Sequence, residues 1–112
     1  MDKIYAVQGS DLEGLVASPN LVLVDFWAAW CAPCRMLAPT FEKLAQKFAA
    51  GVRFAKVDVD ALPDLAAKYD VRSIPTLLLL KDGKEVERWI GVRSYDELAR
   101  RLESHARIPA RS

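Results

Sequence analysis

Residues 21–34 read LVLVDFWAAWCAPC. The first half of this run is rich in β-branched and aromatic residues and hardly alternates, which predicts a central strand covered on both faces. After the two cysteines, apolar residues recur at spacings of three and four and predict a long amphipathic helix that ends near Gly51: Met36, Leu37, Thr40, Phe41, Leu44, Ala45 and Phe48. Pro39 lies inside this helix and should kink it. The cysteine pair is therefore expected between a buried strand and a long helix.

Segments on both sides extend this strand and helix into a regular alternation. The apolar runs that read as further strands are residues 3–7 and 52–59. Ser10 and Glu13 form a capping box that opens a helix ending near Asn20. Pro63 suits a first helical turn and begins a short helix that runs through Tyr69. Up to this point the expected order is three strands, each followed by a helix.

The last third of the chain predicts an antiparallel hairpin and a closing helix. Its two strand-like segments, residues 76–80 and 84–90, are joined by a Lys-Asp-Gly sequence, and Asp-Gly is a strong hairpin signal. We assign Gly83 to this turn as a structural residue. Ser94 starts a second capping box, so the domain should close with a helix to about His105.

Length, composition and charge limit the class of protein. The chain has 112 residues, of which 52% are hydrophobic, and 16 Lys and Arg against 15 Asp and Glu leave a formal charge of +1. We predict one domain over residues 1–106 and a short tail, residues 107–112, that frays. The low net charge argues against nucleic acid or a membrane surface as a partner. The start of the chain lacks a signal peptide and no apolar run is long enough to span a membrane, so we expect a cytoplasmic protein.

Cys31 and Cys34 are the only cysteines, and with the lone His105 they are too few for a structural zinc site. Residues three apart lie on one face of a helical turn, so the pair can cycle between dithiol and disulfide. The amides at a helix start favour the thiolate form of Cys31, which we predict to be the attacking thiol. Cys34 should be more buried and act as the resolving thiol. By spacing alone, half of a zinc site or an accidental pair is the alternative, whereas Arg35 after Cys34 removes the haem-attachment motif.

Asp25 lies in the middle of the apolar strand. A buried carboxylate there costs several kcal/mol unless it is neutral, paired or hydrogen-bonded, so burial should raise its pKa. The alternative is that Asp25 faces solvent at the end of the strand.

Two segments carry a family resemblance. Residues 24–34 (VDFWAAWCAPC), with Ser-Ile-Pro-Thr at residues 73–76, closely resemble the thioredoxin family, and the resemblance extends from about residue 4 to residue 105. It implies the α/β thioredoxin fold, a mixed four- or five-stranded sheet flanked by about four helices, in agreement with the predicted order. The family usually has Gly-Pro between the cysteines, where this chain has Ala32-Pro33. Because Ala stiffens the first helical turn relative to Gly, the reduction potential stays open.

The resemblance also implies roles for residues around the cysteines. Asp25 would lie beneath the disulfide and help to deprotonate Cys34. Lys56 matches a lysine near that carboxylate, although it could equally extend outward from a strand edge. A cis bond between Ile74 and Pro75 would pack against the cysteine pair, leave the preceding amide and carbonyl free for an extended substrate, and exclude metal ions. From sequence alone, Pro75 could instead be an ordinary proline at a strand entry.

Two tryptophans flank the cysteines, and such aromatic residues are more often core than function. We assign Trp27 to support beneath the active-site loop and Trp30 to an exposed contact. Six residues are expected to form a flat apolar rim around Cys31: Trp30, Ala32, Pro33, Ile74, Gly91 and Val92. Together with Pro75 and Thr76, they are the residues expected to bind substrate. Gly91 is expected to let the backbone of a partner approach closely.

The activity that the resemblance implies is reduction of protein disulfides, which leaves Cys31–Cys34 oxidised. An NADPH-dependent thioredoxin reductase would regenerate the dithiol of this protein-disulfide reductase, with no bound cofactor and no metal, and we expect a monomer. One alternative is a more oxidising disulfide exchanger or isomerase, although that class usually carries His between the cysteines and is exported. The other is a binding subunit or chaperone-like adaptor in which the apolar rim matters and the thiols do not.

Overall fold

The computed structural model describes residues 4–8, 11–17 and 21–106. Its elements follow the predicted order of three strand and helix pairs, a hairpin and a last helix: β1 (Ile4–Ala6), α1 (Asp11–Val16), β2 (Leu21–Trp27), α2 (Ala32–Phe48), β3 (Val52–Asp58), α3 (Pro63–Lys68), β4 (Thr76–Lys81), β5 (Lys84–Ile90) and α4 (Tyr95–Ala106). The predicted cap at Ser10, the end of the first helix near Asn20 and the tail at residues 107–112 lie outside the described residues.

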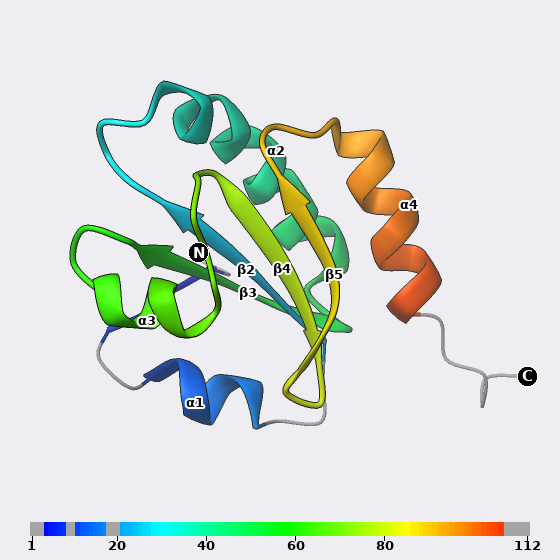
Figure 1. Ribbon diagram of the computed structural model, residues 1–112. Helices are drawn as coiled ribbons and strands as arrows, with labels where there is room; N and C mark the ends of the chain where they lie inside the picture. The colour runs from blue at the N-terminus through cyan, green and yellow to red at the C-terminus, as the bar shows by residue number, and fades with distance from the viewer. Residues whose placement is uncertain (1–3, 9–10, 18–20, 107–112) are drawn as a thin grey trace, which may run out of the picture.

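The five strands form one mixed sheet in the order β1-β3-β2-β4-β5 (Figure 1). β1 and β2 both pair in parallel with β3, whereas β4 pairs antiparallel with β2 and with β5. The central position predicted for β2 is confirmed, since residues 21–26 are all buried. Because β2 and β3 are parallel neighbours, their carboxyl ends reach the same edge of the sheet.

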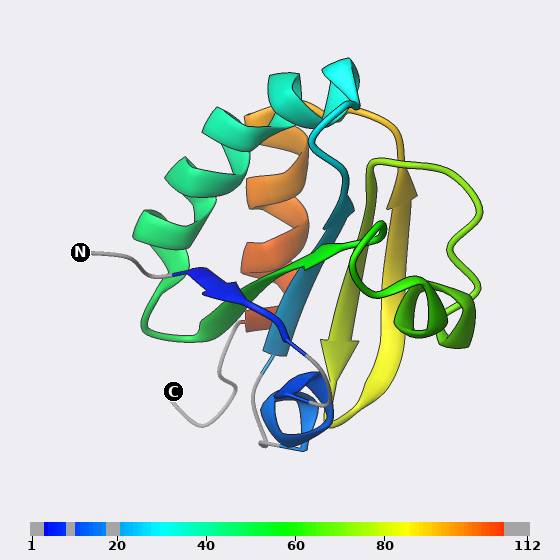
Figure 2. The same ribbon diagram turned by 90° about the vertical axis from the view of Figure 1, so that its left-hand side faces the viewer.

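Helices cover both faces of this sheet (Figure 2). On one face, Leu21 and Leu23 pack with apolar residues of α2 and α4. On the other face, Val22, Val24 and Phe26 pack with residues of α1 and α3. Successive side chains of β2 therefore enter two different cores, and this double burial explains why the strand shows no polar alternation.

The long helix α2 ends earlier than the predicted boundary near Gly51. The last residue of its apolar stripe, Phe48, is also its last helical residue, and Ala49 is the C-cap. Gly51 belongs to a turn in which its N–H donates to the carbonyl of Phe48 at 3.0 Å. Pro39 is exposed and lies inside the helix, where it can donate no backbone hydrogen bond. The kink at Pro39 stays a prediction.

In the last third, the predicted turn is confirmed, as is the Ser94 side of the predicted capping box. Asp82 and Gly83 form a two-residue loop between β4 and β5 with φ of 52° and 81°. Positive φ at both positions is the requirement of a type I′ hairpin turn, which suits Gly in particular. At the start of α4, the hydroxyl oxygen of Ser94 accepts a hydrogen bond from the N–H of Glu97 at 3.1 Å. None of the helices in the described ranges is long and apolar enough to cross a membrane.

Candidate active site

The two cysteines lie at the start of α2, after the short loop that follows β2. Cys31 is the N-cap of α2, in an extended conformation with φ −89° and ψ 108°, and Cys34 is in the first turn of that helix. They form a disulfide, with their Cα atoms 5.2 Å apart. The backbone N–H of Cys34 donates to Cys31 Sγ at 3.2 Å. A sulfur atom thus occupies the capping position that a Ser or Asp oxygen takes in many helices, beside amides without a helical partner.

Both cysteines are only 4% exposed, so the expectation that Cys34 is more buried than Cys31 is wrong for this disulfide state. The two cysteines form one buried cluster with Ala28, and Trp27, Val59 and Ile74 pack against this cluster. The two residues differ instead in what they face. Cys31 lines an open cleft, and Cys34 is not among the residues of its lining.

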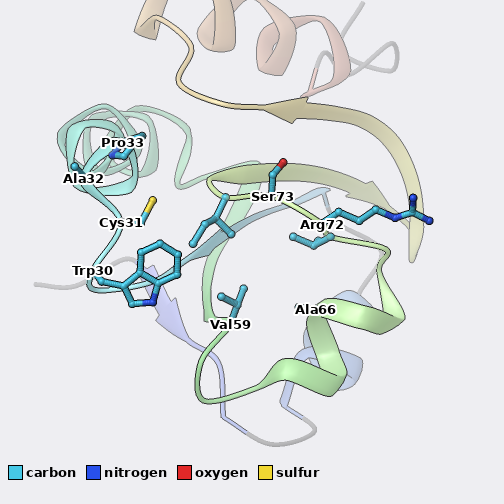
Figure 3. A pocket seen from close by; sticks show the side chains of 10 residues that line it. Trp30, Cys31, Ala32, Pro33, Val59, Ala66, Arg72 and Ser73 are labelled. Atoms are coloured by element: carbon cyan, nitrogen blue, oxygen red, sulfur yellow. The ribbon is translucent and has the colours of Figure 1, made fainter.

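This cleft has a volume of about 530 Å³ and two walls (Figure 3). One wall comes from the active-site loop and the start of α2. The other comes from α3 and the loop before β4. The lining residues are Trp30, Cys31, Ala32, Pro33, Val59, Ala66, Val71, Arg72, Ser73 and Ile74. In Figure 3 the guanidinium of Arg72 points away from Cys31, which leaves the space beside the sulfur mainly apolar. The site is therefore hollowed, in contrast to the flat rim that was expected.

Four residues predicted to bind substrate do not line the cleft. Pro75 is buried, and its bond to Ile74 is cis, which confirms the predicted isomer. Thr76 is 1% exposed and its hydroxyl donates to the carbonyl of Ser73 at 2.7 Å, so its side chain is structural and not placed for a substrate contact. Gly91 and Val92 lie beyond β5. Val92 is 42% exposed there, and is therefore accessible without belonging to the cleft.

Gly91 has a conformational role that sequence reasoning missed. Its φ is +94°, a region that L side chains rarely adopt. Its N–H donates to the carbonyl of Pro75 at 2.8 Å, which ties the loop after β5 to the cis proline. By contrast, the N–H and the carbonyl of Ile74 make no hydrogen bond within the described part of the chain. These two groups remain available beside Cys31.

Trp30 is 67% exposed, in line with its predicted place at the surface. Its Nε1 donates to the carboxylate of Asp60 at 2.8 Å, and this bond fixes the indole at the mouth of the cleft. Asp60 is itself held by Asp58, whose carboxylate accepts from the Asp60 N–H at 2.9 Å. Trp27, in contrast, is half-buried and packs against the cluster of Ala28 and the two cysteines, as expected of a supporting residue.

Asp25 is buried, with 1% exposure, so the solvent-facing alternative is wrong. Neither carboxylate oxygen has a hydrogen-bond partner among the described residues. Burial raises the pKa of Asp25 from 3.8 to about 7, and the positive charge of Lys56 opposes this rise. Lys56 is the cross-strand neighbour of Asp25, and its Nζ lies 4.5 Å from the centre of the Trp27 ring. A carboxyl with this pKa changes its charge at neutral pH.

Comparisons with known proteins agree with this geometry. The thioredoxin family model matches residues 3–104. Thioredoxins of Staphylococcus aureus strains Mu50 and MW2 are each 44% identical to this chain over 102 residues, which cover 91% of this chain and 97% of theirs. A solved structure of a mutant thioredoxin from Halobacterium salinarum NRC-1 has a TM-score of 0.88 and 39% identity, and the match covers 95% of this chain and 93% of that one.

The chain belongs to the thioredoxin family. With the Cys31–Cys34 pair as its redox centre, it is a thiol-disulfide oxidoreductase that acts on protein disulfides. Among the residues of the described ranges, no group of three or more His, Cys, Asp or Glu side chains could hold a metal ion.

Sequence reasoning missed five cleft residues of this thioredoxin-family site: Val59, Ala66, Val71, Arg72 and Ser73. The first could have been found, because parallel strands end at one edge of a sheet, and Val59 directly follows the parallel neighbour of β2. Its N–H donates to the carbonyl of Trp27 at 2.9 Å and so continues the ladder to the active-site loop. The others depend on how α3 packs and on the path of the chain after it, which no local pattern reveals.

Proposed function

We propose that Cys31 attacks the disulfide of a client protein and that Cys34 resolves the mixed disulfide. The observation that carries this assignment is that Cys31 lines the cleft and Cys34 does not. In the first step, the thiolate of Cys31 bonds to one client sulfur and the other client sulfur leaves as a thiolate. In the second step, the thiolate of Cys34 attacks Cys31 Sγ and releases the first client sulfur. Two electrons pass to the client, which ends as a dithiol, while Cys31–Cys34 becomes a disulfide.

The start of α2 stabilises the attacking thiolate. The N–H of Cys34 already points at Cys31 Sγ, and this donor favours negative charge on the sulfur when the pair is reduced. No basic side chain has to be assigned to this task.

Asp25 is proposed to accept the proton of the Cys34 thiol in the second step. Along β2, Asp25 lies on the same face as Leu23, the face covered by α2. It is also near the strand end from which the chain enters the first turn of α2. A carboxyl with a pKa of about 7 can both take a proton from a thiol and return it near neutral pH. Lys56 would tune this group through its charge.

The cleft is proposed to hold an extended segment of the client around its disulfide. Trp30, Ala32 and Pro33 offer one apolar wall. On the other wall, Ile74 offers a side chain and two backbone groups that make no hydrogen bond with any described residue. An extended peptide that pairs with the backbone of Ile74 gains hydrogen bonds that do not depend on its sequence. Many different clients could therefore bind in one site.

The proposed electron source is an NADPH-dependent thioredoxin reductase. It would act on a monomeric domain over residues 1–106 in the cytoplasm, with no cofactor bound to the domain.

The roles assigned to the two cysteines predict that iodoacetamide at pH 7 alkylates Cys31 of the reduced protein at least about ten-fold faster than Cys34. Mass spectrometry of the digested protein measures both rates, and equal rates would contradict the assigned roles.

Insulin reduction coupled to NADPH consumption tests the reaction class in the same preparation. The Cys34→Ser variant should retain client as a mixed disulfide on Cys31, whereas the Cys31→Ser variant should not. If a double Cys31→Ser, Cys34→Ser variant kept the biological function, the adaptor hypothesis would replace this proposal.

A further inference from the structure

The side chain of Arg88 in β5 connects the second wall of the cleft to the sheet, although Arg88 does not itself line the cleft. Arg88 Nη2 donates to the carbonyl of Tyr69 at 2.7 Å, and Arg88 Nη1 donates to the carbonyl of Asp70 at 3.1 Å. These carbonyls belong to the two residues directly before Val71, the first residue of the loop that lines the cleft. The guanidinium is therefore anchored to the chain immediately ahead of that loop.

At the end of α3, the carbonyls of Tyr69 and Asp70 accept no backbone hydrogen bond from any described residue. The N–H of Asp70 donates to the carbonyl of Ala67 at 3.0 Å, and the N–H of Val71 donates to the carbonyl of Ala66 at 2.9 Å. This pair of bonds is a Schellman motif, and it needs a left-handed residue, here Asp70 with φ 56°. Glycine usually takes that position, because a Cβ makes the left-handed region less favourable. Asp70 therefore adopts an unfavourable backbone conformation at this turn, and the hydrogen bonds from Arg88 stabilise it.

A β-bulge in β5 helps to orient the side chain of Arg88. Register shifts between Leu79 and Leu80, which face Glu87 and Glu85 respectively. In a regular strand, residues three apart point to opposite faces, but the extra residue puts Glu85 on the same face as Arg88. The Glu85 carboxylate then accepts from Arg88 Nε at 2.8 Å and from Nη2 at 2.9 Å. This two-point contact orients the guanidinium toward the end of α3.

We propose that Arg88 is a positioning residue for client binding, which sets the place of the cleft wall formed by Val71, Arg72, Ser73 and Ile74. This inference rests on the proposed function, in which clients bind in the cleft. Arg88 holds two consecutive carbonyls, so the backbone enters the loop in one orientation. The N–H and carbonyl of Ile74, which make no hydrogen bond with any described residue, lie four residues after Asp70. Their direction therefore depends on the orientation in which the backbone enters the loop. Without Arg88, the wall keeps its residues and loses its fixed distance from Trp30 and Cys31.

The test compares the kinetics of Arg88→Met with those of the wild type in the insulin assay. We expect the KM for insulin to rise about five- to ten-fold, the effect of losing one or two hydrogen bonds to a charged donor. The kcat and the alkylation rate of Cys31 should change less than about two-fold, because the reacting atoms are untouched. Arg88→Lys should lie between the two proteins, since an ammonium has donors but no planar fork.

A matched control is Arg101→Met, which also removes an arginine that pairs with a β5 carboxylate, that of Glu87. Arg101 belongs to α4, and its hydrogen bond to Glu87 does not reach α3. Its KM should equal that of the wild type. Amide hydrogen exchange gives a second readout, which should accelerate at residues 71–74 in Arg88→Met and not in Arg101→Met.

The outcomes separate the two proposals. A wild-type protein that reduces insulin, together with an unchanged KM in Arg88→Met, overturns this inference and leaves the proposed function intact. A wild-type protein that does not reduce insulin overturns the proposed function itself. An equal rise of KM in Arg101→Met would mean general destabilisation and would also overturn the inference. If Arg88→Met does not fold, Glu85→Gln frees the guanidinium with less damage and should raise the KM about two- to three-fold.

Discussion

Asp25 and Glu87 are two carboxylates on the same face of the sheet, in opposite surroundings. Asp25 follows Leu23 on the face of β2 that α2 covers, and it has no hydrogen-bond partner among the described residues. Glu87 lies opposite Leu79 on β5, and its carboxylate accepts from Arg101 Nε at 2.6 Å and contacts His105 Nε2 at 2.7 Å. The first carboxyl is enclosed by apolar residues, whereas the second is half-buried between two basic side chains.

This difference reverses the direction of the two pKa shifts. Burial raises the pKa of Asp25 to about 7. Burial also acts to raise the pKa of Glu87, but the hydrogen bonds and charges of Arg101 and His105 together lower it. A partnered carboxylate joins β5 to α4 and serves the fold. A carboxylate without a hydrogen-bond partner weakens the fold when it ionises, and such a carboxyl in the core is a candidate for the proton transfer proposed for Asp25.

The largest expected effect of this contrast is on stability. The folded state keeps the proton on Asp25 up to about pH 7, whereas an unfolded chain releases it near 3.8. Between these values the folded state binds more protons, so the free energy of unfolding falls as pH rises. The shift from 3.8 to about 7 corresponds to at most about 4 kcal/mol. Urea unfolding of oxidised Asp25→Asn from pH 4 to pH 8 should lack this fall, which the wild type should show.

Glu87→Gln is the control for that experiment, because its expected pH dependence has the opposite sign. The pKa of Glu87 is lowered in the folded state, so its contribution is present above the unfolded value of 4.5 and is lost as pH falls. Glu87→Gln should therefore be less stable than the wild type by about 1 kcal/mol at pH 7 and nearly equal to it at acid pH. Parallel pH curves for Asp25→Asn and the wild type would refute the assignment of the raised pKa to Asp25.

A smaller effect is expected on the rate of disulfide reduction. If Asp25 accepts the proton of Cys34, Asp25→Asn should slow the reduction of insulin about 100-fold at pH 7, the contribution of one general base. The rate should also lose its rise through the pH range around 7. Glu87→Gln should keep the wild-type rate within about two-fold, because it lies outside the site. An Asp25→Asn variant with an unchanged pH profile would remove Asp25 from proton transfer.

The sequence was informative where one strong local pattern decides the structure. The double burial of β2 follows from a run without alternation, and the turn at Gly83 follows from an Asp-Gly pair whose φ angles are both positive. The buried state of Asp25 follows from its neighbours Val24 and Phe26, since a polar residue inside such a run has no solvent face. These patterns are local, so no long-range contact is needed to interpret them.

The missed features depend on how the folded backbone places side chains, whether the residues in contact are neighbours or far apart in the sequence. The burial of Thr76 depends on a bond to Ser73 in a turn that only the folded loop defines. Cys31 and Cys34 are equally exposed in the disulfide state, although Cys34 lies further into α2. The contact of Arg88 with Tyr69 spans 19 positions, and Glu85, which orients Arg88, reaches the same face only because a bulge shifts β5 by a single residue. A one-residue shift changes which face a side chain occupies, and sequence periodicity does not determine it.

Lys56 offers the finest test of the contrast, because it is the one partner whose charge acts on Asp25 in the described structure. Its positive charge lowers the pKa of Asp25 against the effect of burial, so Lys56→Met should raise that pKa above about 7. The pH midpoint of insulin reduction should move upward, and the rate at pH 7 should fall about two- to three-fold. Methionine keeps an apolar stem against the Trp27 ring, which limits any loss of packing.

Lys47→Met is the control, because it removes the same charge from the last turn of α2. Lys47 lies about 20 Å along the helix from Cys34, which is beyond the screening length in physiological salt. Its midpoint should stay where the wild type has it, and a midpoint that also stays fixed in Lys56→Met would assign Lys56 to packing against Trp27 alone.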